Sequence, residues 1–167
     1  SNTQLLSMTI EKATNRNISD LVKEWFIDPL GFENNIFWQI DGKKNNSIKA
    51  YCCFNSNARD FARFGKLYKD FGKWNGTQIL DSTFIAKSIK PRFEESSEYG
   101  YGFWLGEINK NRFFAMRGIL GQYVIVIPEK NTIIVRLGER NNEKDNNRPK
   151  DFDSYFIESL NMLEKSN

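Results

Sequence analysis

Histidine is absent from this chain of 167 residues, and its absence excludes several kinds of catalytic site. Without an imidazole, the chain alone cannot form a Ser-His-Asp triad or a Cys-His dyad, and it cannot offer His ligands to zinc or iron. If the protein is hydrolytic, its proton transfers must use Lys, Tyr or a carboxylate.

Cysteine is nearly absent, because Cys52 and Cys53 are the only two. Adjacent residues rarely form a disulfide, which excludes a disulfide framework. Two neighbouring thiols are also too few to build a zinc cage, and we expect neither a metal site nor a cofactor. We therefore predict a pair of buried thiols, which behave as small apolar side chains.

Long apolar runs and concentrated charge are also missing. No stretch of about 18 apolar residues occurs, so the sequence predicts no membrane span. The net charge is only +3, with basic residues scattered among acids, which argues against a nucleic-acid partner. No signal peptide is visible. A bacterial periplasmic or secreted location would follow only if the parent protein carries such a peptide.

The composition and the apolar patterns of the chain predict a folded domain of the α+β class. Hydrophobic residues make up 40% of the chain and aromatic residues 14%, which is enough for a real core. Residues 1–98 read as mainly helical with loops. The expected helices are 3–15, a second one capped by Ser19 and ended by Pro29 and Gly31, a third that begins at an Asn57–Asp60 capping box, and a fourth from Ser82 to Ile89.

The period of the apolar pattern changes near residue 99 from the helical spacing to alternation. Residues 99–138 predict antiparallel strands, of which 123–127 and 132–137 form a hairpin. Tyr99, Tyr101, Phe103 and Leu105 are predicted to share one strand face. The segment 139–150 reads as a solvated loop, and 151–165 as a final amphipathic helix that covers the sheet. No linker is visible, so we expect 1–167 to be a single partial domain.

Several blocks, in this order and spacing, resemble the C-terminal part of the serine β-lactamase and penicillin-binding-protein superfamily. Its nearest branch resembles the class C-related esterases and the 6-aminohexanoate-dimer-hydrolase-like amide hydrolases. The resemblance implies an antiparallel sheet covered by helices, as in the C-terminal part of a β-lactamase or transpeptidase-like fold. The blocks that carry it are Asn2–Leu6, Trp25–Gly31, Trp38 with Asp41, Ala50–Phe54, Ala58–Gly65, and Gly118–Tyr123 with Pro128-Glu129.

This superfamily uses a Ser-x-x-Lys serine as nucleophile, and the resemblance therefore implies an acyl-enzyme. No Ser-x-x-Lys occurs in the 167 residues, because the spacings at Ser47 and Ser88 are one residue too short. The resemblance places the catalytic Tyr just before Ser1. We therefore expect the chain to be the C-terminal half of a catalytic domain, with no catalytic nucleophile or base of its own.

The third family motif, Lys-Thr-Gly or His-x-Gly, aligns with Met116-Arg117-Gly118. The resemblance implies that Gly118 belongs to the active-site strand and that the Ile119 amide contributes to the oxyanion hole. Met116 lacks the usual positive charge, and Arg117 should point to the opposite face of the sheet. The remaining candidates for the substrate pocket are Met116, Arg117, Gln122, Trp38 and Cys52.

Alternative interpretations of several candidate residues remain. Gln122 could instead bond a neighbouring strand, and Trp38 and Cys52 could be structural anchors. Tyr99, Tyr101 and Trp104 suggest either an aromatic groove or ordinary packing, and Arg59 with Asp60 suggests a charge pair at a helix start.

The leading hypothesis is a fragment of a serine hydrolase that acts on a small ester, amide or β-lactam-like substrate. A non-catalytic binding module with the same fold is the alternative. A half-domain would expose apolar surface, so we also predict dimerisation, aggregation or retention of the missing half.

Overall fold

The computed structural model describes residues 1–33, 36–42, 47–139, 144–145 and 148–165. It has the α+β architecture that the sequence predicts, with helices and an antiparallel sheet. By its internal contacts the chain divides into two compact units, residues 1–60 and residues 61–167. The predicted single partial domain stays a prediction.

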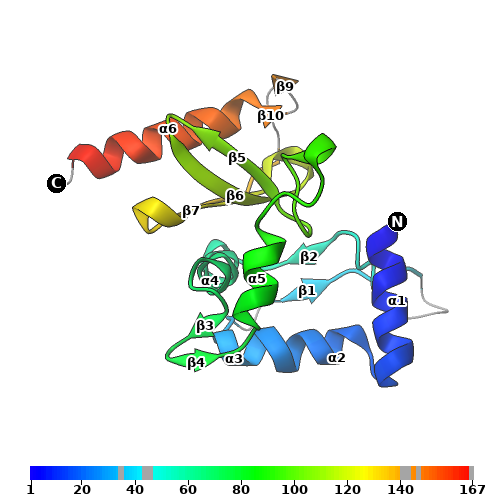
Figure 1. Ribbon diagram of the computed structural model, residues 1–167. Helices are drawn as coiled ribbons and strands as arrows, with labels where there is room; N and C mark the ends of the chain where they lie inside the picture. The colour runs from blue at the N-terminus through cyan, green and yellow to red at the C-terminus, as the bar shows by residue number, and fades with distance from the viewer. Residues whose placement is uncertain (34–35, 43–46, 140–143, 146–147, 166–167) are drawn as a thin grey trace. The chain divides into compact units, whose positions relative to one another are not determined.

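The first unit is mainly helical (Figure 1). Helix α1 runs from Asn2 to Thr14, as predicted, and a second helical run extends from Ile18 to Leu30. That run consists of α2 (Ile18–Val22), a π-helical turn (Lys23–Ile27) and α3 (Asp28–Leu30). Two short strands, β1 (Phe37–Trp38) and β2 (Phe54–Asn55), pair antiparallel.

Two helix boundaries differ from the predicted ones. Asn17, rather than Ser19, occupies the N-cap position of α2. Pro29 does not end the helical run but lies within it, in α3, which follows the π-helical turn. Gly31 is the residue that ends the run, because it adopts the left-handed conformation with φ +66°.

Helix α4 (Ala58–Lys69) begins with the predicted capping box, in which the Asp60 N–H donates to Asn57 Oδ1 at 3.0 Å. The Asp60 carboxylate is fully buried and accepts from the Glu33 N–H at 3.0 Å and from the Ser56 hydroxyl. Arg59 is 84% exposed and lies 3.8 Å from Glu33. The sequence reading of Arg59 and Asp60 as a charge pair is therefore corrected, since Asp60 instead holds the chain that leads into α4.

We expect Asp60→Ala to lower the free energy of unfolding by about 2 kcal/mol, because it leaves the part-buried Glu33 N–H and Ser56 hydroxyl without their acceptor. Urea denaturation followed by circular dichroism measures the change. Arg59→Ala is the matched control, and its exposed ion pair predicts a loss below about 0.5 kcal/mol. Equal effects of the two variants would contradict this role of Asp60.

The second unit contains a four-stranded antiparallel sheet in the order β5-β6-β7-β8 (Figure 1). Its strands are β5 (Trp104–Ile108), β6 (Asn111–Arg117), β7 (Tyr123–Ile127) and β8 (Thr132–Arg136). Each strand pairs with its neighbour in sequence, and the predicted β7–β8 hairpin is confirmed. The short strands β3 (Lys73–Trp74) and β4 (Thr77–Gln78) form a separate hairpin, and β9 (Lys144–Asp145) pairs with β10 (Arg148–Pro149).

Residues 99–103 are not the predicted strand. The Gly100 N–H donates to the Phe103 carbonyl, and the Tyr101 N–H donates to the Ser88 carbonyl, so this segment is a turn. A Cβ on Gly100 would lie 2.1 Å from the Ser88 oxygen, which explains the glycine by close approach of two backbones. The tyrosines therefore do not share a strand face with Phe103.

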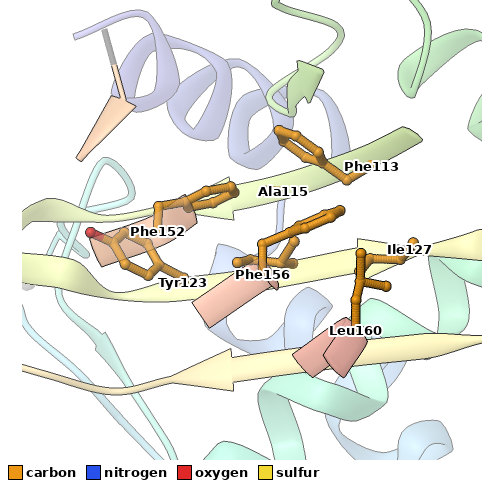
Figure 2. Packing of buried hydrophobic residues seen from close by; sticks show 8 residues of the cluster. Phe113, Ala115, Tyr123, Ile127, Phe152, Phe156 and Leu160 are labelled. Carbon is orange, nitrogen blue, oxygen red and sulfur yellow. The ribbon is translucent and has the colours of Figure 1, made fainter. Parts of the chain in front are cut away.

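Helices cover both faces of this sheet. On one face α6 (Lys150–Lys165) packs Phe152, Phe156 and Leu160 against side chains of β6 and β7 (Figure 2). This confirms the predicted role of the last helix. On the other face α4 and α5 (Ser82–Ser88) contribute Tyr68 and Ile85 to a second cluster with Phe103, Phe114, Val124 and Val126.

Two further details concern the ends of these helices. Asp81, not Ser82, caps α5 by accepting from the Phe84 N–H at 2.7 Å. Beyond the end of α4, Phe71 is 48% exposed and has φ +50°. The predicted loop 139–150 lies partly outside the described residues, and its described part is corrected, because it contains the β9–β10 pairing and the first residue of α6.

Candidate functional site

The end of strand β6 turns sharply at the residues that align with the third family motif. The Gly118 N–H donates to the Gln122 carbonyl at 2.8 Å, which closes a turn over Ile119–Gly121. A Cβ on Gly118 would lie 3.0 Å from Gln122 Cβ, so a larger residue would press on the strand that follows. Leu120 adopts φ +60°, a conformation that is uncommon for a non-glycine residue.

This turn is exposed at its tip and fixed at its base. Ile119 is 82% exposed and Leu120 is 50% exposed. At the base, Gln122 Nε2 donates to the Gly138 carbonyl, and the Gly138 N–H donates to Gln122 Oε1 at 3.2 Å. Both ends of the Gln122 amide are therefore used to hold the segment just after β8, and its placement in a substrate pocket stays a prediction.

Met116 and Arg117 lie on opposite faces of the sheet, as alternation predicts. Met116 packs against the cluster that contains Phe114. The Arg117 guanidinium lies 4.4 Å from the centre of the Trp104 ring and 5.7 Å from that of Phe152, on the face covered by α6. Burial lowers the pKa of Arg117 from its usual value, because the charged form loses hydration.

The other two pocket candidates belong to the first unit, and the structure brings them together there. The Trp38 indole N–H donates to the Cys52 carbonyl at 3.0 Å and to the Lys49 carbonyl at 3.1 Å. The Trp38 ring also meets Phe54 edge to face, with 5.3 Å between ring centres. Trp38 and Phe54 line a cavity of about 600 Å³ in this unit, together with Ile48, Ser19, Lys23 and Asp28.

The prediction of two buried thiols is wrong. Cys52 and Cys53 are joined by a disulfide, and both residues are partly exposed. The bond is possible because the chain turns at this point, with the Cys52 N–H donating to the Lys49 carbonyl at 3.1 Å and Cys53 at φ +69°. Such a turn is set by contacts of the folded loop, which the spacing of the cysteines did not reveal.

The aromatic residues before β5 do not form one groove. Tyr99 packs edge to face on Trp104, with ring centres 5.1 Å apart, whereas Tyr101 lies 6.1 Å from the Phe84 ring and under the Arg92 guanidinium. The two tyrosines thus face different neighbours, which favours the packing alternative.

The sequence did not predict a group of interacting polar side chains beside the sheet. The Tyr123 hydroxyl donates to Asp151 Oδ1 at 3.1 Å, and Arg136 Nη2 lies 3.6 Å from Asp151 Oδ2. These residues come from β7, β8 and the start of α6, and no spacing in the sequence connects them. Burial, then the hydrogen bond to Asp151, raises the pKa of Tyr123 to about 12.

We expect stability to fall between pH 10 and 12 through Tyr123. An unfolded tyrosine ionises near pH 10, whereas folded Tyr123 stays neutral until about 12, so its contribution is present below pH 10 and is lost above it. Urea denaturation at about pH 9 and about pH 11 measures the loss. In Tyr123→Phe the drop should be smaller, and an unchanged drop would contradict the assignment.

No group of three or more metal-binding side chains that could hold a metal ion occurs in the part of the chain that the structure describes. Among the helices of the described ranges, none is long and apolar enough to cross a membrane.

Sequence and fold comparisons assign this architecture to a known class. The family model described as Beta-lactamase matches residues 1–154, so the chain belongs to the beta-lactamase family. The family resemblance predicted from the sequence is thereby confirmed. No curated protein matches the chain.

Two solved structures share the fold. A protein from Bacillus anthracis assigned as a 6-aminohexanoate-dimer hydrolase has 24% identity and a TM-score of 0.73, over 97% of this chain and 42% of that one. A protein from Bacteroides dorei assigned as a beta-lactamase has 16% identity and a TM-score of 0.64, over 91% of this chain and 54% of that one. The 167 residues thus span about half the length of these structures.

Proposed function

We propose that this chain is part of a serine hydrolase that cleaves an ester or amide through an acyl-enzyme. In this proposal Gly118 ends the active-site strand and the Ile119 N–H is one of the two donors that stabilise the oxyanion. The observation that carries the proposal is the turn after β6, whose tip is exposed while Gln122 fixes its base. Oxyanion stabilisation needs a donor whose position is fixed before the substrate binds, and the held base of this turn supports that requirement.

The nucleophile in this proposal comes from polypeptide outside the 167 residues. The chain contains no Ser-x-x-Lys, and it spans 42% and 54% of the two solved structures. The 167 residues alone would then be inactive. Membership of the beta-lactamase family supports the reaction class.

Met116 supports an ester or amide over a β-lactam as substrate. The resemblance implies a cation at this position in the enzymes that hold a substrate carboxylate, and a thioether cannot form such an ion pair. A neutral acyl substrate makes no demand for that charge.

Labelling with a fluorophosphonate and a fluorescent penicillin tests the proposal, with intact mass spectrometry as the readout. The 167-residue chain should form no adduct. The protein that joins this chain to a Ser-x-x-Lys segment should form a stoichiometric fluorophosphonate adduct, which is lost when that serine becomes alanine. A stoichiometric adduct on the 167-residue chain, or full ester hydrolysis without the serine, would reject the proposal.

A non-catalytic binding module is the second candidate, and Met116 in place of Lys or His is the observation that favours it. The two candidates differ in the upstream sequence. An intact Ser-x-x-Lys followed by the family Tyr supports the enzyme, whereas a degenerate motif supports the binding module.

We also propose that the 167-residue chain self-associates. On α1 the apolar side chains of Leu5, Leu6 and Met8 are more than half exposed, and the buried residue of this helix is Ser7. Apolar surface of this kind favours association. Sedimentation velocity should show dimers or larger species at rising concentration, and a monomer throughout would contradict the proposal.

A further inference from the structure

The Cys52–Cys53 disulfide closes the shortest ring that two cysteines of one chain can form, because the residues are adjacent. A disulfide that joins distant residues stabilises a fold by restricting the unfolded chain, and this effect grows with the length of the closed loop. A bond between neighbours restricts almost none of the chain. Its effect must therefore lie in the local conformation of the loop that carries it.

That loop is held through its carbonyl groups, which ties the disulfide to the surrounding structure. The Trp38 indole N–H donates to the carbonyl of Cys52, and the Gln39 N–H donates to that of Cys53 at 3.2 Å. Cys53 adopts φ +69°, which L residues rarely adopt. Opening the bond would allow Cys53 to leave this conformation and would release the carbonyls that hold Trp38 and Gln39.

Cys52 and Cys53 are both partly exposed residues, which is compatible with a reagent approaching the bond from solution. Thiol–disulfide exchange requires a thiolate to approach one of the two sulfurs, and access is one of the factors that set its rate. A fully buried bond would lack this access. The position of the pair at the surface of the loop thus suits exchange.

We propose that Cys52–Cys53 is a redox site that exchanges with dithiol reductants and sets the conformation of residues 49–53. Because the carbonyls of Lys49 and Cys52 hold the Trp38 indole, we call this segment the Trp38 loop. A thiolate of the dithiol attacks one sulfur, forms a mixed disulfide and releases the other cysteine as a thiolate. The second thiol of the reductant then displaces the first cysteine. The pair gains two electrons and two protons, and the dithiol becomes a disulfide.

This exchange is expected to change the wall of the cavity in the same unit. Trp38, Ile48 and Phe54 line that cavity, and all three come from the strands or loop that the disulfide holds. Reduction would therefore loosen one wall of a cavity of about 600 Å³. This inference goes beyond the proposed hydrolase activity and does not depend on it.

The test incubates the folded, air-oxidised chain with dithiothreitol, alkylates it with iodoacetamide and measures its intact mass. Without reductant no cysteine should be alkylated. With reductant and no denaturant, both should be alkylated in one step. Alkylation before reduction, or a bond that opens only in denaturant, would overturn the proposal.

The fluorescence emission of Trp38 reports on the conformation of the Trp38 loop. Reduction should change the emission of the wild type, and the change should be lost in Trp38→Phe. Trp25→Phe is the matched control in the same unit, and it should keep the change. The double variant Cys52→Ser/Cys53→Ser should not respond to dithiothreitol. A change that persists in Trp38→Phe, or none in the wild type despite reduction, would show that the pair does not control this loop.

Discussion

Replacing Ile119 by proline is expected to slow acyl-enzyme formation about 100- to 1,000-fold, which is the usual cost of losing one oxyanion donor. Proline removes the backbone N–H and little else here. Gly118 has φ −101° and ψ 172°, an extended conformation that a following proline allows. Ile119 itself begins a helical turn, where proline fits. The rate is measured with an activated ester on the protein that includes the Ser-x-x-Lys segment.

Ile119→Ala is the matched control for this prediction. The Ile119 side chain is 82% exposed, so its truncation removes little packing and keeps the amide. Acylation by Ile119→Ala should stay within a few-fold of the wild type. If the proline variant acylates as fast as the alanine variant, the Ile119 amide does not stabilise the oxyanion, although the wider assignment as a serine hydrolase could still hold.

Phe156→Ala is expected to cost about 3–5 kcal/mol of unfolding free energy. Phe156 is fully buried between α6 and the sheet, and its ring centre lies 5.5 Å from that of Phe113 (Figure 2). Alanine would leave a cavity in the centre of this cluster. Urea denaturation measures the loss of stability.

Glu158→Ala is the control on the same helix, since Glu158 is exposed and its removal should change stability by less than about 0.5 kcal/mol. If Phe156→Ala and Glu158→Ala were equally stable, α6 would not be packed on the sheet in solution.

The strands and helices that bury one continuous face were predictable from the sequence. The apolar run at Tyr123–Ile127 and the helical spacing of Phe152, Phe156 and Leu160 each report burial directly. Residues 99–103 were not predictable in this way, because alternating aromatics with glycines fit both a strand and a turn. The contact of Gly100 with Ser88 decides between them, and it is a tertiary contact.

In the candidate site, too, local patterns predicted some features, whereas tertiary contacts determine the others. The motif alignment placed Gly118 and Ile119 at a strand end, where the structure has the turn after β6. The pairing of Gln122 with Gly138 and that of Tyr123 with Asp151 join residues far apart in the chain. Patterns of local spacing carry no signal for such pairs. The prediction of two free thiols was wrong for another reason. Neighbouring cysteines rarely form a disulfide, but the loop that carries Cys52 and Cys53 has an unusual conformation.

The order of the strands also has a kinetic consequence. Every strand of the β5–β8 sheet pairs with the strand next to it in sequence, so the pairings need only short loops to close. Sheets whose contacts are local form faster than those that must bring distant segments together. Residues 104–136 can therefore assemble their hydrogen-bond ladder early, and α6 can then dock on a surface that already exists.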